Sequence, residues 1–248
     1  MKQRSAFKTA NSIIFYLSCL LLLASCWQRN DFPEGMQLDG RLLQEPVQKP
    51  VQEAAFNVSR DGVQYRVEPR YTYDLHGVVV SYEHHDGNYS LHRLWNDHLN
   101  VADICVVWGD NAAGLDLNSF EFWNGAFTCN YQTRDQAAWE RFRPEQLSNN
   151  HLLVDNPHYR KLVQEVRIGD QVYVSGWLTG YSNDKGFTRG TSSTRTDRGN
   201  GACETIYVNE FRIMNSMENG WRTLLNIALL GFIGSSLTWV TAVARGVF

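Results

Sequence analysis

Residues 99–133 read LNVADICVVWGDNAAGLDLNSFEFWNGAFTCNYQT, and this stretch decides the fold that we expect for the chain. Two runs rich in β-branched and aromatic residues flank a segment rich in Asn, Asp and Gly. Such runs suit a pleated, half-buried surface, and the polar segment supplies residues that favour turns. The pattern predicts a β-hairpin that folds about Leu117 and brings Cys105 opposite Cys129.

The flanking sequence continues the β pattern. A small hairpin is expected over 54–68, because Asp61-Gly62 is a favoured turn dipeptide. Asp135 and Asn156 can cap helices with their side chains and predict short helices. The expected strands are 71–83, 166–180 and 205–214, and the expected helices are 136–142 and 157–165. The Ser and Asn side chains of 148–153 are expected to bond backbone groups in local turns.

The order strand, strand, strand, helix, strand, strand and the run GDQVYVSG at 169–176 resemble the OB-fold. The resemblance covers about residues 71–214. It implies a mainly β protein built on a five-stranded closed barrel, with one or two short helices and the helix of the barrel between the third and fourth strands. An SH3-like barrel and a small sandwich are the alternatives.

The first 26 residues have the parts of a secretory signal. Lys2, Arg4 and Lys8 precede an apolar run at 13–23. The sequence Leu23-Ala24-Ser25-Cys26 that follows resembles the lipobox of bacterial lipoproteins. The resemblance implies cleavage before Cys26 and attachment of acyl chains, each buried CH₂ of which contributes about 0.8 kcal/mol to anchoring. An uncleaved N-terminal anchor with an incidental Cys26 thiol is the alternative.

A second apolar stretch, residues 223–244, has no charged side chain. At a rise of about 1.5 Å per residue it spans about 30 Å, the thickness of a hydrocarbon core, so it predicts a C-terminal transmembrane helix. Gly231 and Ser235 repeat the small-residue spacing that lets helices approach closely. This spacing predicts a helix of another envelope protein on this face, and the alternative is ordinary helix composition that faces lipid.

The chain is expected to have four parts. These are a signal or anchor at 1–26, an extended linker at 27–53, a barrel domain with its preceding hairpin at 54–220, and the transmembrane helix within 221–248. The linker is expected to be extended because its polar residues are spaced by prolines. Anchors at both ends predict a protein of the inner membrane with most of the chain in the periplasm.

Charge is distributed unevenly along the chain. All 26 acidic residues lie between the two apolar ends, whereas five of the 23 basic residues belong to the ends. An acidic middle repels phosphate backbones and counts against nucleic-acid binding. The membrane and other envelope proteins are the expected partners.

Three cysteines, Cys105, Cys129 and Cys203, follow Cys26. In an oxidising compartment an odd number implies one bridge and a free thiol, or an intermolecular link. Hairpin register favours Cys105–Cys129. Cys129–Cys203 is the rival, because the third and fifth strands are neighbours in an OB-type barrel. Three reduced, buried cysteines are the remaining possibility.

Two loops hold candidate binding residues. The loop 84–98 contains His84, His92 and His98, whose imidazoles could ligate zinc, although their spacing matches no zinc signature. If the strand continued through them, His84 and His85 would point in opposite directions. The loop 182–202 carries Arg side chains that could bind anions, and the alternative is that this loop pairs with the oppositely charged loop 84–98. Together with nearby aromatic residues, the candidates for ligand binding are Trp177, Tyr181, Arg189, Arg195 and Arg198.

The sequence has no phosphate-binding Gly loop, no His-Glu-x-x-His, no Cys-x-x-Cys and no nucleophile elbow. It favours a non-catalytic, membrane-anchored binding or assembly subunit of a bacterial envelope complex, without a cofactor. Two other functions stay open. One is a zinc-dependent envelope enzyme that uses the loop 84–98, and the other is a ligand sensor that signals through the C-terminal helix.

Overall fold

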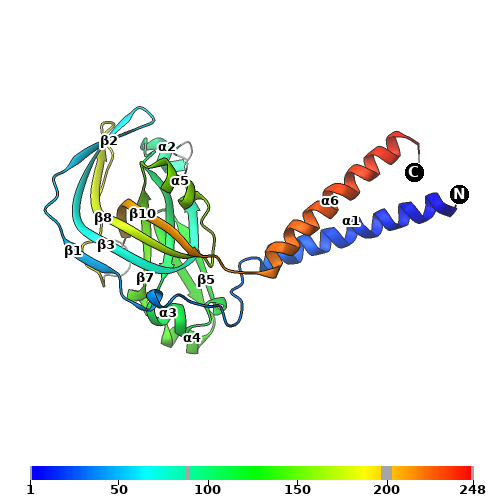
Figure 1. Cartoon of the computed structure of the whole chain (residues 1–248), viewed down its shortest axis with the longest axis horizontal. Coiled ribbons are helices and arrows are strands. Elements are labelled where there is room, and N and C mark those ends of the chain that lie inside the picture. Colours follow the sequence, from blue (N-terminus) through cyan, green and yellow to red (C-terminus); the bar gives the residue numbers. More distant parts are fainter. Residues whose placement is uncertain (1, 86, 88–89, 197–202, 247–248) are drawn as a thin grey trace. The chain divides into compact units, whose positions relative to one another are not determined.

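The computed structural model describes residues 2–85, 87, 90–196 and 203–246 (Figure 1). The chain divides into two compact units. The first unit comprises Met1–Glu34 and Glu218–Phe248, and the second comprises Gly35–Met217.

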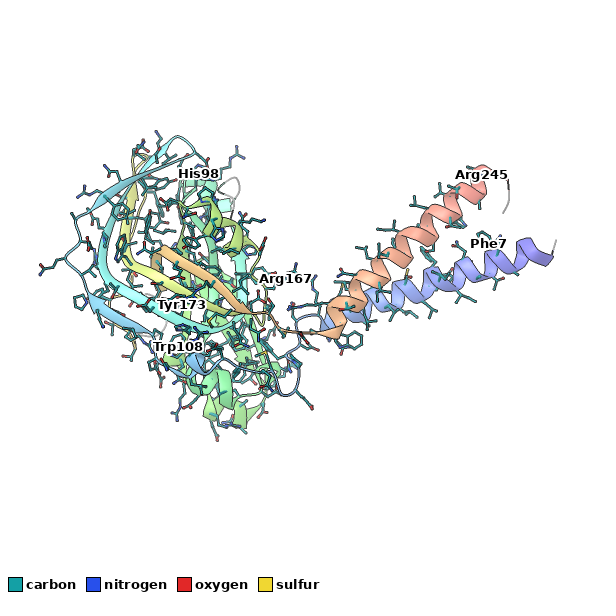
Figure 2. All side chains as sticks on the ribbon, viewed as in Figure 1. Phe7, His98, Trp108, Arg167, Tyr173 and Arg245 are labelled. Atoms are coloured by element: carbon teal, nitrogen blue, oxygen red, sulfur yellow. A yellow bond between two sulfur atoms is a disulfide. The ribbon has the colours of Figure 1, made fainter. Side chains whose placement is uncertain are left out.

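Two long helices, α1 (Lys2–Gln28) and α6 (Gly220–Ala244), make up most of the first unit and run side by side (Figure 1). Both are long and apolar enough to cross a membrane, judged by length and composition. Phe7 and Arg245 lie toward the same end of the pair (Figure 2), so the helices are antiparallel. The predicted C-terminal apolar helix is thus confirmed, and α1 continues through Cys26 without a break.

Small and polar side chains join the two helices. The Asn11 side-chain amide donates to the Ser235 carbonyl at 3.1 Å, and this bond is buried. Gly231 lies against Ser18, whose hydroxyl oxygen a Cβ on the glycine would meet at 2.5 Å. The Gly231/Ser235 face, which we expected to meet another protein, is therefore occupied by α1 of the same chain.

The second unit is mainly β. Its described residues form an eight-stranded sheet and a two-stranded sheet. The strands are β1 (Val47–Pro50), β2 (Phe56–Arg60), β3 (Val63–His84), β4 (Asn100–Val107), β5 (Phe120–Gly125), β6 (Thr128–Thr133), β7 (Leu147–Leu153), β8 (Gln171–Asn183), β9 (Thr188–Arg189) and β10 (Cys203–Asn215). The short helices are η1 (Gly40–Leu43), α2 (Ser90–Leu94), α3 (Gly109–Gly114), η2 (Leu117–Ser119), α4 (Gln136–Arg141), η3 (Pro144–Gln146) and α5 (Pro157–Gln164).

Five strands pair in a closed ring, in the order β3-β4-β7-β10-β8 and back to β3. The pair β7–β10 is parallel and the other four pairs are antiparallel. The 22 residues of β3 make this closure possible, since 65–78 pair with β8 and 78–84 pair with β4. Each ring strand therefore has a partner on both sides.

The ring strands alternate apolar side chains toward a common core, as expected for period-2 packing. The fully buried members include Leu75, Ile104, Leu152, Val174 and Phe211, and Val163 of α5 packs against them. The Asn156 side chain caps α5 by accepting from the His158 amide, and the Asp135 side chain caps α4. Both predicted helices are thus present.

The central hairpin predicted over 99–133 is wrong. β4 pairs with β3 and β7, whereas β5 pairs with β6 in a separate hairpin. β4 is buried along its whole length, so it belongs inside the large sheet rather than in an exposed ribbon. The expectation of local turns over 148–153 is also wrong. These residues belong to β7, because pairing with β4 and β10 satisfies their backbone groups.

The structure differs from the expected linker over 27–53. Leu42 in η1 is fully buried, and β1 pairs with β3 through the register Val47↔Asp74 to Pro50↔Tyr71. Proline is tolerated at this place because β1 is an edge strand, where one amide needs no partner. The hairpin predicted around Asp61-Gly62 is confirmed, with positive φ angles of 48° and 77° at the turn.

Gly176 provides a test of ring closure. It lies on β8 between Tyr73 of β3 and Val208 of β10, and a Cβ there would collide with the Tyr207 carbonyl oxygen. We expect Gly176→Ala to lower the free energy of unfolding by about 2 kcal/mol, because the backbone must shift to relieve the clash. Denaturant unfolding of the full chain in detergent micelles measures this change.

Gly190→Ala is the matched control, because nothing lies within 4 Å of a Cβ at that position. Equal stability of the two variants would contradict the close strand approach at Gly176.

Candidate functional site

A row of polar side chains crosses β3, β4 and β7. In the strand register Asp103 pairs with Glu83 on one side and with His151 on the other. Directly opposite residues point to the same face of a sheet, so these three side chains form a row. Ile104 and Leu152, one residue further along, alternate toward the apolar core. The polar row therefore lies on the outer face of the ring.

The β5–β6 hairpin covers this polar row. Its Asn124 side chain bonds Ser81 of β3 and donates to the Asp103 carbonyl at 3.1 Å. Cys129 lies at disulfide-bonding distance from Cys105 of β4, with the Cα atoms 5.7 Å apart. The hairpin is thus fixed to the ring by a covalent link and by hydrogen bonds, and it buries side chains that would otherwise face water.

The cysteine pair is the one that the sequence favoured, but for a different reason. Cys129 faces Asn124 within its own hairpin, and the link to Cys105 runs between two separate sheets. Cys203 is a free cysteine, whose sulfur lies 3.4 Å from the Phe127 carbonyl. Burial raises the pKa of its thiol.

Asp103 is the centre of a buried hydrogen-bond network. Its Oδ1 accepts from His151 Nδ1 at 2.6 Å and from Asn100 Nδ2 at 2.9 Å, and His85 Nε2 lies 3.4 Å away. The side chain is only 1% exposed. Burial by itself raises the pKa of this carboxyl, but His151 and His85 outweigh burial and hold the pKa well below its usual range. Asp103 is therefore ionised at neutral pH.

His151 links Asp103 to a guanidinium group. Its Nε2 lies 2.7 Å from Arg189 Nη2, and a guanidinium can only donate. His151 therefore accepts through Nε2 and carries its proton on Nδ1, toward Asp103. Burial lowers the pKa of His151, which keeps the imidazole neutral. Arg189 also lies over the Phe127 ring at 4.2 Å from its centroid.

A second branch of the network leads to another buried carboxylate. The rings of His85 and His92 stack with their centroids 3.7 Å apart. His92 Nδ1 lies 3.3 Å from Asp97 Oδ2, which accepts from the Tyr181 hydroxyl at 2.7 Å. We call the seven residues Tyr181, Asp97, His92, His85, Asp103, His151 and Arg189 the buried network.

A cavity of about 310 Å³ opens between the buried network and the tip of the β5–β6 hairpin. Phe127 at the tip has a φ of 62°, in the left-handed region, and its ring lies 5.4 Å from His92 and 5.2 Å from Trp95. The cavity is lined by Glu83, His85, Leu91, His92, Asp103, Asn124, Gly125, Ala126 and Phe127.

The residues that we predicted for ligand binding are only partly brought together. Tyr181 and Arg189 reach the buried network, whereas Trp177 packs against Phe56 and Tyr207. Arg198 lies outside the described residues.

Arg195 lies at the other end of β4. Its guanidinium is 4.7 Å from the Trp108 ring centroid and contacts Glu45. Figure 2 shows that Trp108 and His98, which flank β4, lie toward opposite ends of the strand. Arg189 and Arg195 therefore do not belong to one site, because Arg189 contacts His151 and Arg195 contacts Trp108 and Glu45.

The three predicted zinc ligands do not converge. His84 Nε2 lies 3.0 Å from the Val163 carbonyl of α5, whereas His92 belongs to the buried network. The backbone amide of His98 is held by the Tyr65 hydroxyl at 2.9 Å. Among the residues that the structure describes, no group of three His, Cys, Asp or Glu side chains is arranged to hold a metal ion.

The central residues of the site, Asp103 and His151, were missed in the sequence. Asp103 lies within the otherwise apolar run VADICVV, and His151 lies where a polar run becomes apolar, in SNNHLLV. One titratable residue inside a buried strand needs a partner, because unpaired burial is costly. This reasoning could have identified Asp103 and His151 as candidates from the sequence. It could not have predicted that the two residues are partners, because they lie on different strands.

Comparison with known protein families, with characterised proteins and with solved structures finds no match to this chain. Ordered carboxylates and imidazoles around a cavity can bind a polar ligand and orient it. The nearby Ser81 hydroxyl is bonded to Asn124, and the Cys203 thiol has a raised pKa, so neither is activated as a nucleophile.

The disulfide gives a testable prediction. We expect Cys129→Ala to lower the free energy of unfolding by about 3 kcal/mol, because the bond closes a loop across a sequence separation of 24. Cys203→Ala, the control, should cost less than about 1 kcal/mol. A reducing agent should lower the stability of the unsubstituted protein to that of Cys129→Ala, and no effect of reduction would contradict the link.

The buried histidine predicts how stability depends on pH. Burial lowers the pKa of His151, and also of His76 and His84. Between about pH 7.5 and 5.5 the unfolded chain binds protons at these positions that the folded chain does not. The free energy of unfolding should fall on acidification, by up to about 1.4 kcal/mol per pH unit for each such group.

His151→Asn should flatten this dependence, since Asn does not titrate. His158→Asn, at an exposed position of α5, is the control. Unfolding curves at several pH values measure the slopes, and equal slopes for the two variants would refute the assignment to His151.

Proposed function

We propose that this protein is a non-catalytic binding subunit of a bacterial envelope complex, anchored in the inner membrane by a helical hairpin. In this proposal α1 and α6 both span the bilayer, and residues 35–217 lie outside the cytoplasm. The observation that carries the proposal is the polar pairing of the two apolar helices through Asn11 and Ser235.

The helix contacts support retention of α1. A buried Asn amide and close packing at Gly231 are typical of helices that associate within a membrane. Ser25 is also fully buried, within the stretch that resembles a lipobox. Lipidation of Cys26 stays a prediction, and it would require cleavage of α1 from its partner.

The basic residues at the two ends of the chain support an orientation with both termini in the cytoplasm. Lys2, Arg4 and Lys8 precede the first apolar run, and Arg245 follows the second, without an acidic residue at either end. An excess of basic residues favours the cytoplasmic side. Both termini would then lie in the cytoplasm, and the β domain would lie in the periplasm, where a disulfide is stable.

We further propose that the ring β3-β4-β7-β10-β8 is an OB-type barrel. Its strand order, its parallel β7–β10 pair and the position of α5 between β7 and β8 support this. Barrels of this kind bind ligands on one face beside their loops. In this chain the cavity lies on the outer face of β3 and β4, under the β5–β6 hairpin.

Reporter fusions test the proposal in living cells. Alkaline phosphatase, which is active only outside the cytoplasm, should be active when inserted at Gly190 and inactive when fused after Phe248. An active C-terminal fusion would overturn the orientation.

Two further measurements complete the test. One is the intact mass of the purified protein, and the other is cross-linking in native membranes followed by identification of the linked proteins. A chain that retains α1 and cross-links to a stoichiometric envelope partner is expected. A mass that begins at an acylated Cys26 would refute the helical hairpin, and a monomer without partners in native membranes would refute the role as a subunit.

A further inference from the structure

We propose that the cavity beneath the β5–β6 hairpin tip binds a small organic cation through a primary ammonium group. This names the ligand class for the binding site of the proposed function. The inference depends on the cavity and not on the orientation of the protein in the membrane. The alkaline phosphatase fusions therefore test the proposed function without testing this inference.

An unsatisfied carboxylate oxygen marks the site. Asp103 lines the cavity, and its Oδ1 takes the bonds from His151 and Asn100. Its Oδ2 is buried and has no hydrogen-bond partner among the described residues. An ionised carboxylate can only accept, so a ligand that satisfies this oxygen must bring a donor.

The charge of the buried network favours a positively charged donor. Asp97 and Asp103 are 0% and 1% exposed, and Arg189 is the one residue of the seven with a permanent positive charge. The imidazole rings of His85 and His92 stack with their centroids 3.7 Å apart and lie between the two acidic side chains. Burying two carboxylates beside one guanidinium leaves a negative charge that a ligand cation would offset.

Glu83 extends the negative charge to the cavity wall. It pairs with Asp103 in the strand register, so two carboxylates lie on neighbouring strands of one face. Like charges directly opposite each other are destabilising unless a cation lies between them. An ammonium group has three donors and can serve both carboxylates.

The rest of the wall suits a short carbon chain. Leu91, Ala126 and Phe127 supply apolar surface beside the carboxylates. A volume of about 310 Å³ is at the lower end of the range of about 300–1,000 Å³ for ligand pockets, so the ligand is small. A short alkyl amine or diamine fits both the volume and the charge.

Isothermal titration calorimetry on the full chain in detergent micelles tests the inference. The probe is 1,4-diaminobutane at neutral pH, and 1,4-butanediol is its uncharged isostere. We expect saturable binding of the diamine and at least about tenfold weaker binding of the diol, because hydrogen bonds to a charged group are stronger than those to a neutral one.

Two variants locate the site. Glu83→Gln, at an exposed position, should weaken diamine binding at least about fivefold without loss of the fold, and Asp103→Asn should weaken it further. Glu68→Gln removes an exposed carboxylate of the same strand and should leave binding unchanged. Circular dichroism checks that each variant is folded.

Three results would overturn the inference. These are no binding by the folded protein at diamine concentrations up to about 10 mM, equal binding of the diol, or equal weakening by Glu83→Gln and Glu68→Gln.

Discussion

The burial of Asp103 is the constraint on which the β domain depends. A carboxylate that is 1% exposed must be compensated, because taking an isolated charge out of water costs several kcal/mol. His151 and Asn100 supply that compensation from β7 and from the same strand, β4. The bond to His151 requires the register Asp103↔His151, so the pairing of β4 with β7 and the charge on Asp103 stabilise each other.

The two faces of the strands β3, β4 and β7 have different roles. One face packs into the core of the ring, and the β5–β6 hairpin covers the other. Ile104 and Val106 of β4 face the apolar core, whereas the polar row of Glu83, Asp103 and His151 lies on the other face and would ordinarily meet water. The β5–β6 hairpin covers the polar face, and the link between Cys129 and Cys105 keeps it there. This covering converts an ordinary solvated face into a buried network with a cavity beside it, and gives the domain a site that the ring alone would lack.

The helical unit consists mainly of two helices that are long and apolar enough to cross a membrane, and a related rule governs which of their faces would meet there. Apolar side chains have no preference between lipid and a neighbouring helix, so polar and small residues determine which faces meet. Asn11 and Gly231 play that part in α1 and α6. The capping of α6 by the Asn219 side chain, which also donates to the Gln28 carbonyl of α1 at 3.1 Å, holds the other end of the pair.

The sequence by itself determined the features that depend on near neighbours: the Asp61-Gly62 turn, the caps at Asp135 and Asn156, the two apolar helices and the β character of the middle. It also indicated the Cys105–Cys129 pair, although through a hairpin that does not exist. Only the tertiary structure decided that β7 follows β4 in the ring and that Asp103 meets His151, His85 and Arg189. Local chemistry fixes a turn or a cap, whereas strand partners are chosen by contacts between residues far apart in the chain. A register shift of a single residue would turn His151 into the apolar core, so the pairing that creates the site exists only once the whole sheet has formed.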